Sequence, residues 1–122
     1  MPLIAPDMPV LDVYYASTCA PCRAELPVLA DVAREGHPKL VIYLLTDATE
    51  ARAELAAASP QLPASAVALP TGSTEREVLR RAGDDDGILP FARVRAADGR
   101  LCGAWRGILT LERIRALVKA CG

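Results

Sequence analysis

Two cysteines separated by two residues, Cys19-Ala20-Pro21-Cys22, lie where a strand-like run gives way to a helix-like one. This spacing places the sulfurs one helical turn apart, close enough to form a disulfide with little backbone movement. Free backbone N–H groups and the helix dipole at a helix N-terminus favour an anion, so they stabilise a thiolate at Cys19. Pro21 loses nothing there, because first-turn amides have no partner within the helix. We therefore expect Cys19 to attack disulfides and Cys22 to resolve the mixed disulfide.

The other chemistry open to this pair is half of a structural zinc site, which needs four ligands. Only Cys102, Cys121 and His37 could complete such a site, and none of them belongs to a second metal-binding pair. His37, the only histidine, stands in a Gly-His-Pro turn and is expected on a surface loop, which disfavours a Cys–His hydrolase. The residues thus favour redox chemistry with no metal and no cofactor.

The elements that must position the pair can be read from the hydrophobic pattern. Residues 10–15 are β-branched and aromatic, as in a buried strand, and residues 20–35 carry the apolar spacing of a helix packed on a sheet. Further strands are predicted at 40–45, 66–69, 91–95 and 101–106, and further helices from Asp47 to Ala58, from Thr74 to Gly83 and after Thr110. This order predicts an α/β fold with a mixed sheet and helices on both faces. The acidic run Asp84-Asp85-Asp86 is expected to be a solvated loop.

The length and the composition bound the function. The chain has 122 residues, 52 % of them apolar, and a net charge of −1, so we expect one domain over residues 1–122 and no nucleic-acid partner. No apolar run is long enough to span a bilayer, and residues 1–6 lack the basic and apolar regions of a signal peptide.

The segment Cys19-Ala20-Pro21-Cys22-Arg23-Ala24-Glu25-Leu26-Pro27 resembles the active-site helix of the TlpA-like and ResA-like thioredoxins, whose pattern is Cys-x-Pro-Cys-Arg/Lys-x-Glu-x-Pro. Three further landmarks follow in order: Leu89-Pro90 at the family's cis-proline, Asp98-Gly99 at its hairpin turn and Gly107 before its last helix. The resemblance covers nearly the whole chain. It implies the thioredoxin fold, a central mixed β-sheet flanked by helices on both faces.

The resemblance also implies roles for single residues. Pro90 would follow a cis peptide bond, lie beside the two sulfurs and offer a backbone edge to an extended substrate; the alternative is a trans proline entering a strand. Glu25 would modulate proton transfer near the cysteines; the alternative is an exposed helix carboxylate. Pro27 would kink the helix.

The chain departs from the family pattern in three ways. Thr18 stands before the first cysteine where the family usually has tryptophan, so part of an aromatic substrate platform is missing. Val13 stands where many thioredoxins bury an acid beneath the second cysteine, and alternation places Asp12 on the opposite face of the strand. A proton acceptor for Cys22 is then Glu25 or water. Few residues before Val10 remain for the extra N-terminal strands of the TlpA group.

The resemblance predicts a function for this chain, to which there are two alternatives. Proline between the cysteines, with no histidine, resembles the reducing members, so we expect a monomeric reductant of protein disulfides that is itself reduced by a thiol donor. The alternatives are a disulfide oxidase or isomerase, and a non-catalytic metal- or cofactor-handling thiol module. A periplasmic or other extracytoplasmic location is expected, with the cytoplasm as the alternative.

The family pattern does not explain Cys102 and Cys121. Cys102 lies about 16 Å back along a strand from Gly107, at ~3.3 Å per residue, and Cys121 lies about 16 Å along the returning helix, at ~1.5 Å per residue. Because this strand and helix run antiparallel, we expect both cysteines at one edge of the domain, joined in a structural disulfide that favours an oxidising compartment. The alternative is two separate buried thiols.

Overall fold

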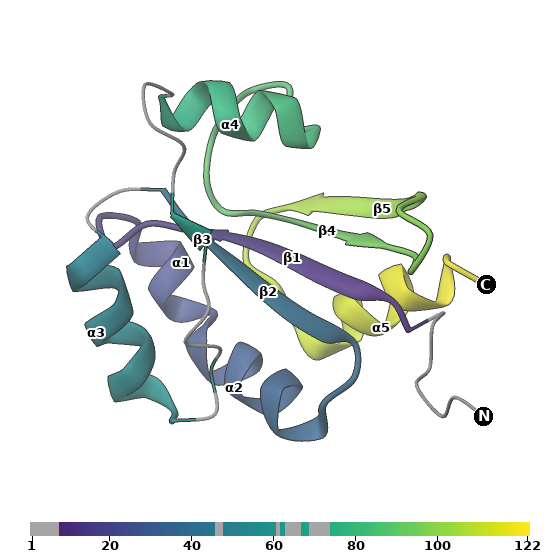
Figure 1. The fold of residues 1–122 in the computed structure, drawn as a ribbon, viewed down its shortest axis with the longest axis horizontal. Coiled ribbons are helices and arrows are strands. Elements are labelled where there is room, and N and C mark those ends of the chain that lie inside the picture. Colours follow the sequence, from purple (N-terminus) through teal and green to yellow (C-terminus); the bar gives the residue numbers. More distant parts are fainter. Residues whose placement is uncertain (1–7, 46–47, 61, 63–66, 69–73) are drawn as a thin grey trace.

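The computed structural model describes residues 8–45, 48–60, 62, 67–68 and 74–122 (Figure 1). The segment 1–6, the helix cap predicted at Asp47 and both ends of the strand predicted at 66–69 lie outside the described residues. The elements follow the predicted order: β1 (Val10–Tyr15), α1 (Ala20–Ala24), α2 (Leu26–Glu35), β2 (Lys39–Leu44), α3 (Ala48–Ala58), β3 (Val67–Ala68), α4 (Glu75–Ala82), β4 (Phe91–Arg95), β5 (Leu101–Arg106) and α5 (Leu111–Lys119). Along the described parts of the chain, no helix has the length and apolar character required to cross a bilayer.

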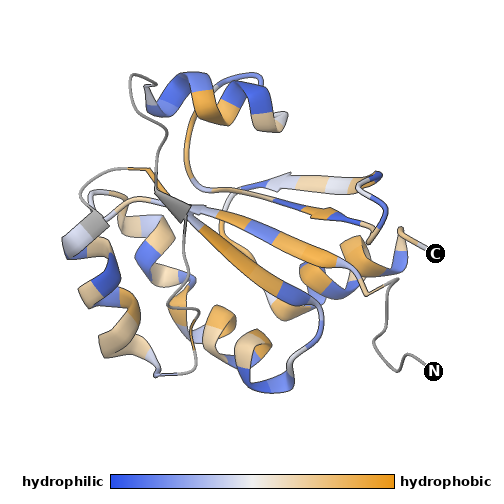
Figure 2. Cartoon of the chain, in the orientation of Figure 1, coloured by the Kyte–Doolittle hydropathy of each residue, from blue (hydrophilic) through white to orange (hydrophobic). Residues whose placement is uncertain are grey.

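The strands form one mixed sheet in the order β3-β2-β1-β4-β5. β1 runs parallel to β2 and antiparallel to β4, and β4 forms an antiparallel hairpin with β5. Figure 1 shows α4 alone on one face and the remaining helices on the other. The predicted mixed sheet with helices on both faces is therefore confirmed, and the strongest hydrophobic colouring runs along the central strands β1 and β2 (Figure 2).

Alternation along β1 divides the core between the two faces. Leu11, Val13 and Tyr15 are completely buried under α1, α2, α3 and α5, whereas Tyr14 points the other way and packs with α4. Asp12 also lies on the α4 side, as predicted, and is completely buried there. Its carboxylate accepts hydrogen bonds from Arg93 Nε at 3.0 Å and Arg95 Nε at 2.8 Å. The buried acid on this strand thus faces away from the active-site helix.

The single helix predicted over residues 20–35 is wrong in one respect, because it breaks at Glu25 between α1 and α2. Pro27 has no N–H to donate to the carbonyl of Arg23, and a proline ring crowds the carbonyl four residues before it. The Glu25 N–H instead bonds to the Cys22 carbonyl at 3.1 Å. The expected distortion at Pro27 is therefore present, and the Glu25 side chain at the break is buried.

Candidate active site

The two cysteines of the predicted pair are joined by a disulfide with a Cα–Cα distance of 5.2 Å. Cys19 is the N-cap residue of α1, and its Sγ accepts a hydrogen bond from the Cys22 N–H at 3.1 Å. Cys19 is partly exposed, whereas Cys22 is completely buried. This difference in exposure agrees with the predicted order of attack, since only Cys19 can be reached from solvent.

Pro90 lies at the same end of the sheet as the cysteines. The Leu89–Pro90 peptide is cis, as expected. Pro90 immediately precedes Phe91, which pairs with Tyr14 near the end of β1, and β1 leads directly into the Cys19 turn. The Pro90 carbonyl accepts a hydrogen bond from the Gly107 N–H at 3.1 Å, so the loop between β5 and α5 lies beside it.

Glu25 is only 2 % exposed, so its alternative as an exposed helix carboxylate is wrong. Its Oε2 accepts a hydrogen bond from the Leu109 N–H at 2.8 Å. Burial raises the pKa of Glu25 from 4.5 to about 7, although the Leu109 hydrogen bond acts in the opposite direction. Glu25 therefore joins the active-site helix to the β5–α5 loop and titrates near neutral pH.

Trp105 braces the same loop from β5. Its indole N–H donates to the Ile108 carbonyl at 3.4 Å, and the Arg113 guanidinium stacks 3.9 Å from the centre of the ring. Ile108 itself is 50 % exposed. The loop is thus held by Glu25 on one side and by Trp105 on the other.

The departures from the family pattern are visible at the site. Thr18 is exposed and supplies no aromatic surface. Val13 is completely buried, so the strand position that holds an acid in the family pattern holds an apolar side chain here. Among the described residues, the buried carboxylates are those of Asp12, Glu25 and Asp84, and only Glu25 adjoins the core that contains Cys22.

The acidic run 84–86 is a solvated loop only in part. Asp85 and Asp86 are exposed, but Asp84 is completely buried, and its Oδ2 accepts a hydrogen bond from the Ile88 N–H at 3.0 Å. Aspartate side chains in turns often accept a hydrogen bond from a nearby backbone N–H. The position of Asp84 shortly before Gly87 was therefore the sequence feature that could have predicted this hydrogen bond.

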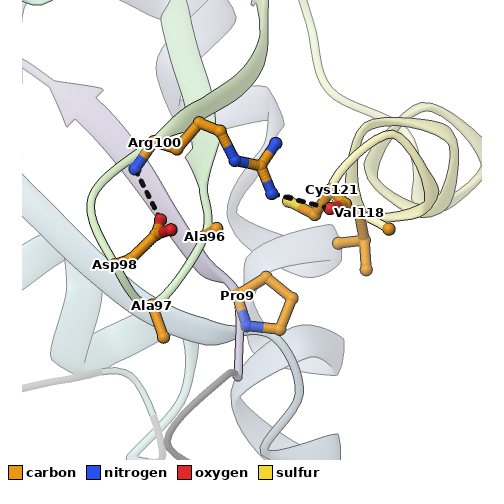
Figure 3. A pocket seen from close by; sticks show the side chains of 8 residues that line it. Pro9, Ala96, Ala97, Asp98, Arg100, Val118 and Cys121 are labelled. Atoms are coloured by element: carbon orange, nitrogen blue, oxygen red, sulfur yellow. Dashed lines mark hydrogen bonds between the residues drawn. The ribbon is translucent and has the colours of Figure 1, made fainter.

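The predicted second disulfide is confirmed, because Cys102 and Cys121 are bonded with a Cα–Cα distance of 4.8 Å. A cavity of about 470 Å³ lies beside it at the β4–β5 turn (Figure 3). Arg100 crosses this cavity and donates from Nη2 to the Cys121 carbonyl at 2.9 Å. This bridge lies at the opposite end of β4 from Pro90, so the two disulfides are separate. Within the described part of the chain, no three His, Cys, Asp or Glu side chains cluster as metal ligands would.

A mixed sheet in this strand order, with a Cys-x-x-Cys pair opening the helix after β1 and a cis-proline entering β4, is the thioredoxin fold used by thiol–disulfide oxidoreductases. The fold and the Cys19–Cys22 pair together define the class of this protein.

Several solved structures are similar to this chain over almost its whole length. A thioredoxin-related protein from Neisseria meningitidis serogroup B is 25 % identical, with a TM-score of 0.71 over 98 % of this chain and 87 % of that one. A putative thiol:disulfide interchange protein DsbE from Chlorobium tepidum is 21 % identical (TM-score 0.69, 95 % and 82 % covered). StoA from Bacillus subtilis is 18 % identical (TM-score 0.68, 91 % and 82 % covered). No protein-family model and no curated protein matches the sequence.

Proposed function

We propose that this protein reduces disulfides in other proteins through Cys19 and Cys22. The observation that carries the proposal is the pair itself, with a partly exposed Cys19 at the helix N-cap and a buried Cys22 one turn further on. The Cys19 thiolate attacks one sulfur of a substrate disulfide, and the other substrate sulfur leaves as a thiolate. The Cys22 thiol then loses its proton and attacks Cys19 Sγ, which expels the second substrate thiolate. Two electrons pass to the substrate, and the protein is left with the Cys19–Cys22 disulfide.

Glu25 supplies the proton acceptor for Cys22 in this scheme. It lies one turn after Cys22, its backbone N–H bonds to the Cys22 carbonyl at 3.1 Å, and its pKa of about 7 suits a group that exchanges protons near neutral pH. Pro90 supplies the edge against which an extended substrate lies, because proline has no N–H and leaves its neighbours' backbone groups to the substrate.

The direction of exchange follows from how strongly the reduced form is stabilised. Strong oxidants hold their thiolate in a highly favourable environment, which makes reduction of their own disulfide favourable. The two residues between the cysteines are Ala20 and Pro21, so no histidine lies between them to stabilise a thiolate. This dipeptide resembles that of the reducing members of the family and supports a reductant.

The reduction potential of the Cys19–Cys22 pair tests the direction. The protein is equilibrated with dithiothreitol or glutathione buffers, quenched by alkylation and mapped by mass spectrometry, which separates this pair from Cys102 and Cys121. We expect a value near the roughly −270 mV of thioredoxin, whereas a value above about −180 mV would assign an oxidase or isomerase instead. Cys19→Ser should abolish attack on insulin disulfides, and Cys22→Ser should accumulate mixed disulfides through Cys19.

The same proposal places the protein outside the cytoplasm. The Cys102–Cys121 bond joins two partly exposed residues, and such bonds persist mainly in oxidising compartments. One similar structure, 16 % identical, is described as a secreted disulfide oxidoreductase of Mycobacterium tuberculosis. Alkylation of thiols at the moment of cell lysis tests the location, because a cytoplasmic protein would carry Cys102 and Cys121 as free, labelled thiols. Sedimentation of the purified protein tests the proposed monomer.

A further inference from the structure

A single buried carboxylate organises the loop that leads from α4 to Pro90. Asp84 follows Gly83, the left-handed residue that ends α4, and its backbone N–H donates to the Leu79 carbonyl at 2.9 Å. Its own carbonyl accepts from the Gly87 N–H at 2.9 Å, and its Oδ2 accepts from the Ile88 N–H at 3.0 Å. Asp84 therefore fixes both the end of the helix and the far side of the turn.

The segment after this turn leads into the cis Leu89–Pro90 peptide. Ile88 is 65 % exposed and lies two residues before Pro90. Leu89 between them packs, like Cys19, against the hydrophobic clusters on both faces of the sheet. Because the Ile88 N–H is bonded to Asp84, the direction in which Ile88 and Pro90 leave the turn depends on that carboxylate.

Burial of the Asp84 carboxylate is costly to the folded state. Asp84 is completely buried, and its Oδ1 has no hydrogen-bond partner among the described residues. Burying a carboxylate away from water is destabilising, and a neutral side chain could accept the same N–H. The contribution of Asp84 that the structure shows is therefore the orientation of this turn, through the Ile88 N–H that it binds.

We propose that Asp84 is a positioning residue for substrate binding. It holds the segment 88–90 so that its backbone edge and the Ile88 side chain contact an extended protein segment beside the disulfide under attack. The inference rests on the proposed disulfide exchange and assigns to this loop the recognition of a polypeptide rather than the chemistry at sulfur.

Two disulfides of different size test the proposal. Reduced protein is reacted with insulin, which must lie along the 88–90 edge, and with 5,5′-dithiobis(2-nitrobenzoate), which needs only Cys19. For Asp84→Ala we expect the half-saturating insulin concentration to rise about tenfold. The segment 88–90 loses the hydrogen bond that orders it, and insulin binding must then order it at a cost of about one hydrogen bond to a charged acceptor. The maximal rate and the rate with the small disulfide should be unchanged. Asp84→Asn, which keeps an acceptor for Ile88, should restore insulin binding, and Asp85→Ala at the exposed neighbour is the matched control.

Hydrogen exchange at the Ile88 amide gives a readout that does not depend on activity. The amide should be protected in the wild type and in Asp84→Asn and should exchange rapidly in Asp84→Ala. If Asp84→Ala does not fold, Gly87→Ala disturbs the same turn, since Gly87 has φ +65° and a Cβ there would lie 2.5 Å from Arg76 Cγ.

The outcomes separate the two proposals. A fast-exchanging Ile88 amide with unchanged insulin kinetics, or an equal loss with both disulfides after correction for folded protein, overturns the role of Asp84. Wild-type protein that reacts with neither disulfide refutes the proposed exchange instead, and the exchange rates of the Ile88 amide still show whether Asp84 holds the loop.

Discussion

Replacing Glu25 with glutamine should change how stability depends on pH. Glutamine has nearly the same shape, and its Oε1 can still accept the Leu109 N–H that Glu25 binds at 2.8 Å. It cannot ionise, however, so the substitution removes the buried charge and leaves the packing in place. The wild type and the variant therefore differ in a single titration, and every other group cancels when the two are compared.

The size and sign of the difference in stability between the two proteins follow from the pKa of Glu25, which burial raises from 4.5 to about 7. At ~1.4 kcal/mol per pH unit, this shift corresponds to about 3 kcal/mol. Because the pKa of the folded state is the higher one, the folded protein binds the extra proton between these two values. The contribution of protonated Glu25 is complete below about pH 4.5 and is lost as the pH rises to about 7.

Urea unfolding of both proteins with their disulfides intact, at intervals from pH 4 to pH 8, measures the effect. The two free energies of unfolding should be similar at pH 4, and Glu25→Gln should be the more stable protein by up to about 3 kcal/mol at pH 8. A difference that stays constant over this range would refute the assignment of Glu25 as a buried acid that is protonated below neutral pH.

Two further substitutions test the remaining supports of the fold. Replacing both Cys102 and Cys121 with serine should lower the free energy of unfolding by about 3 kcal/mol, from the closure of a loop of about twenty residues; the rate with a small disulfide should be retained, and a cost near zero would contradict a structural role. Asp12→Ala should destabilise by about 3 kcal/mol, the lower end for a broken buried ion pair, because Arg93 and Arg95 are 25 % and 31 % exposed and can rehydrate. Urea unfolding measures both, and an Asp12→Ala cost no larger than that of Asp85→Ala would show that the ion pairs add nothing.

Local patterns were sufficient to predict most of the fold. The helix caps at Thr74 and Thr110 and the Asp98-Gly99 turn are read from neighbouring residues, and the structure contains each of them. The pairing of Cys102 with Cys121 was also predictable, because rise per residue converts sequence spacing into distance along an element.

Predictions that depend on tertiary contacts were weaker. Glu25 is buried against Leu109, which is 84 residues away in the sequence. The spacing of apolar residues along the chain cannot predict a contact between residues so far apart. The sequence does not distinguish Asp84 from its exposed neighbours Asp85 and Asp86. Its burial depends on how α4 packs over Phe91, which is a tertiary contact. The distortion of the helix near Pro27 was predictable from the proline alone. The burial of Glu25 was not, because it depends on the contact of its carboxylate with the β5–α5 loop.

Trp105 gives the protein a built-in optical probe. It is the only tryptophan in the chain, so all tryptophan fluorescence originates from one indole. That indole binds the Ile108 carbonyl and lies under the Arg113 guanidinium, and the next amide, of Leu109, is held by Glu25. Emission is sensitive to a nearby cation and to the polarity around the ring. We therefore expect the ionisation of Glu25 to change the emission of Trp105, which would allow this titration to be followed without a label on either cysteine.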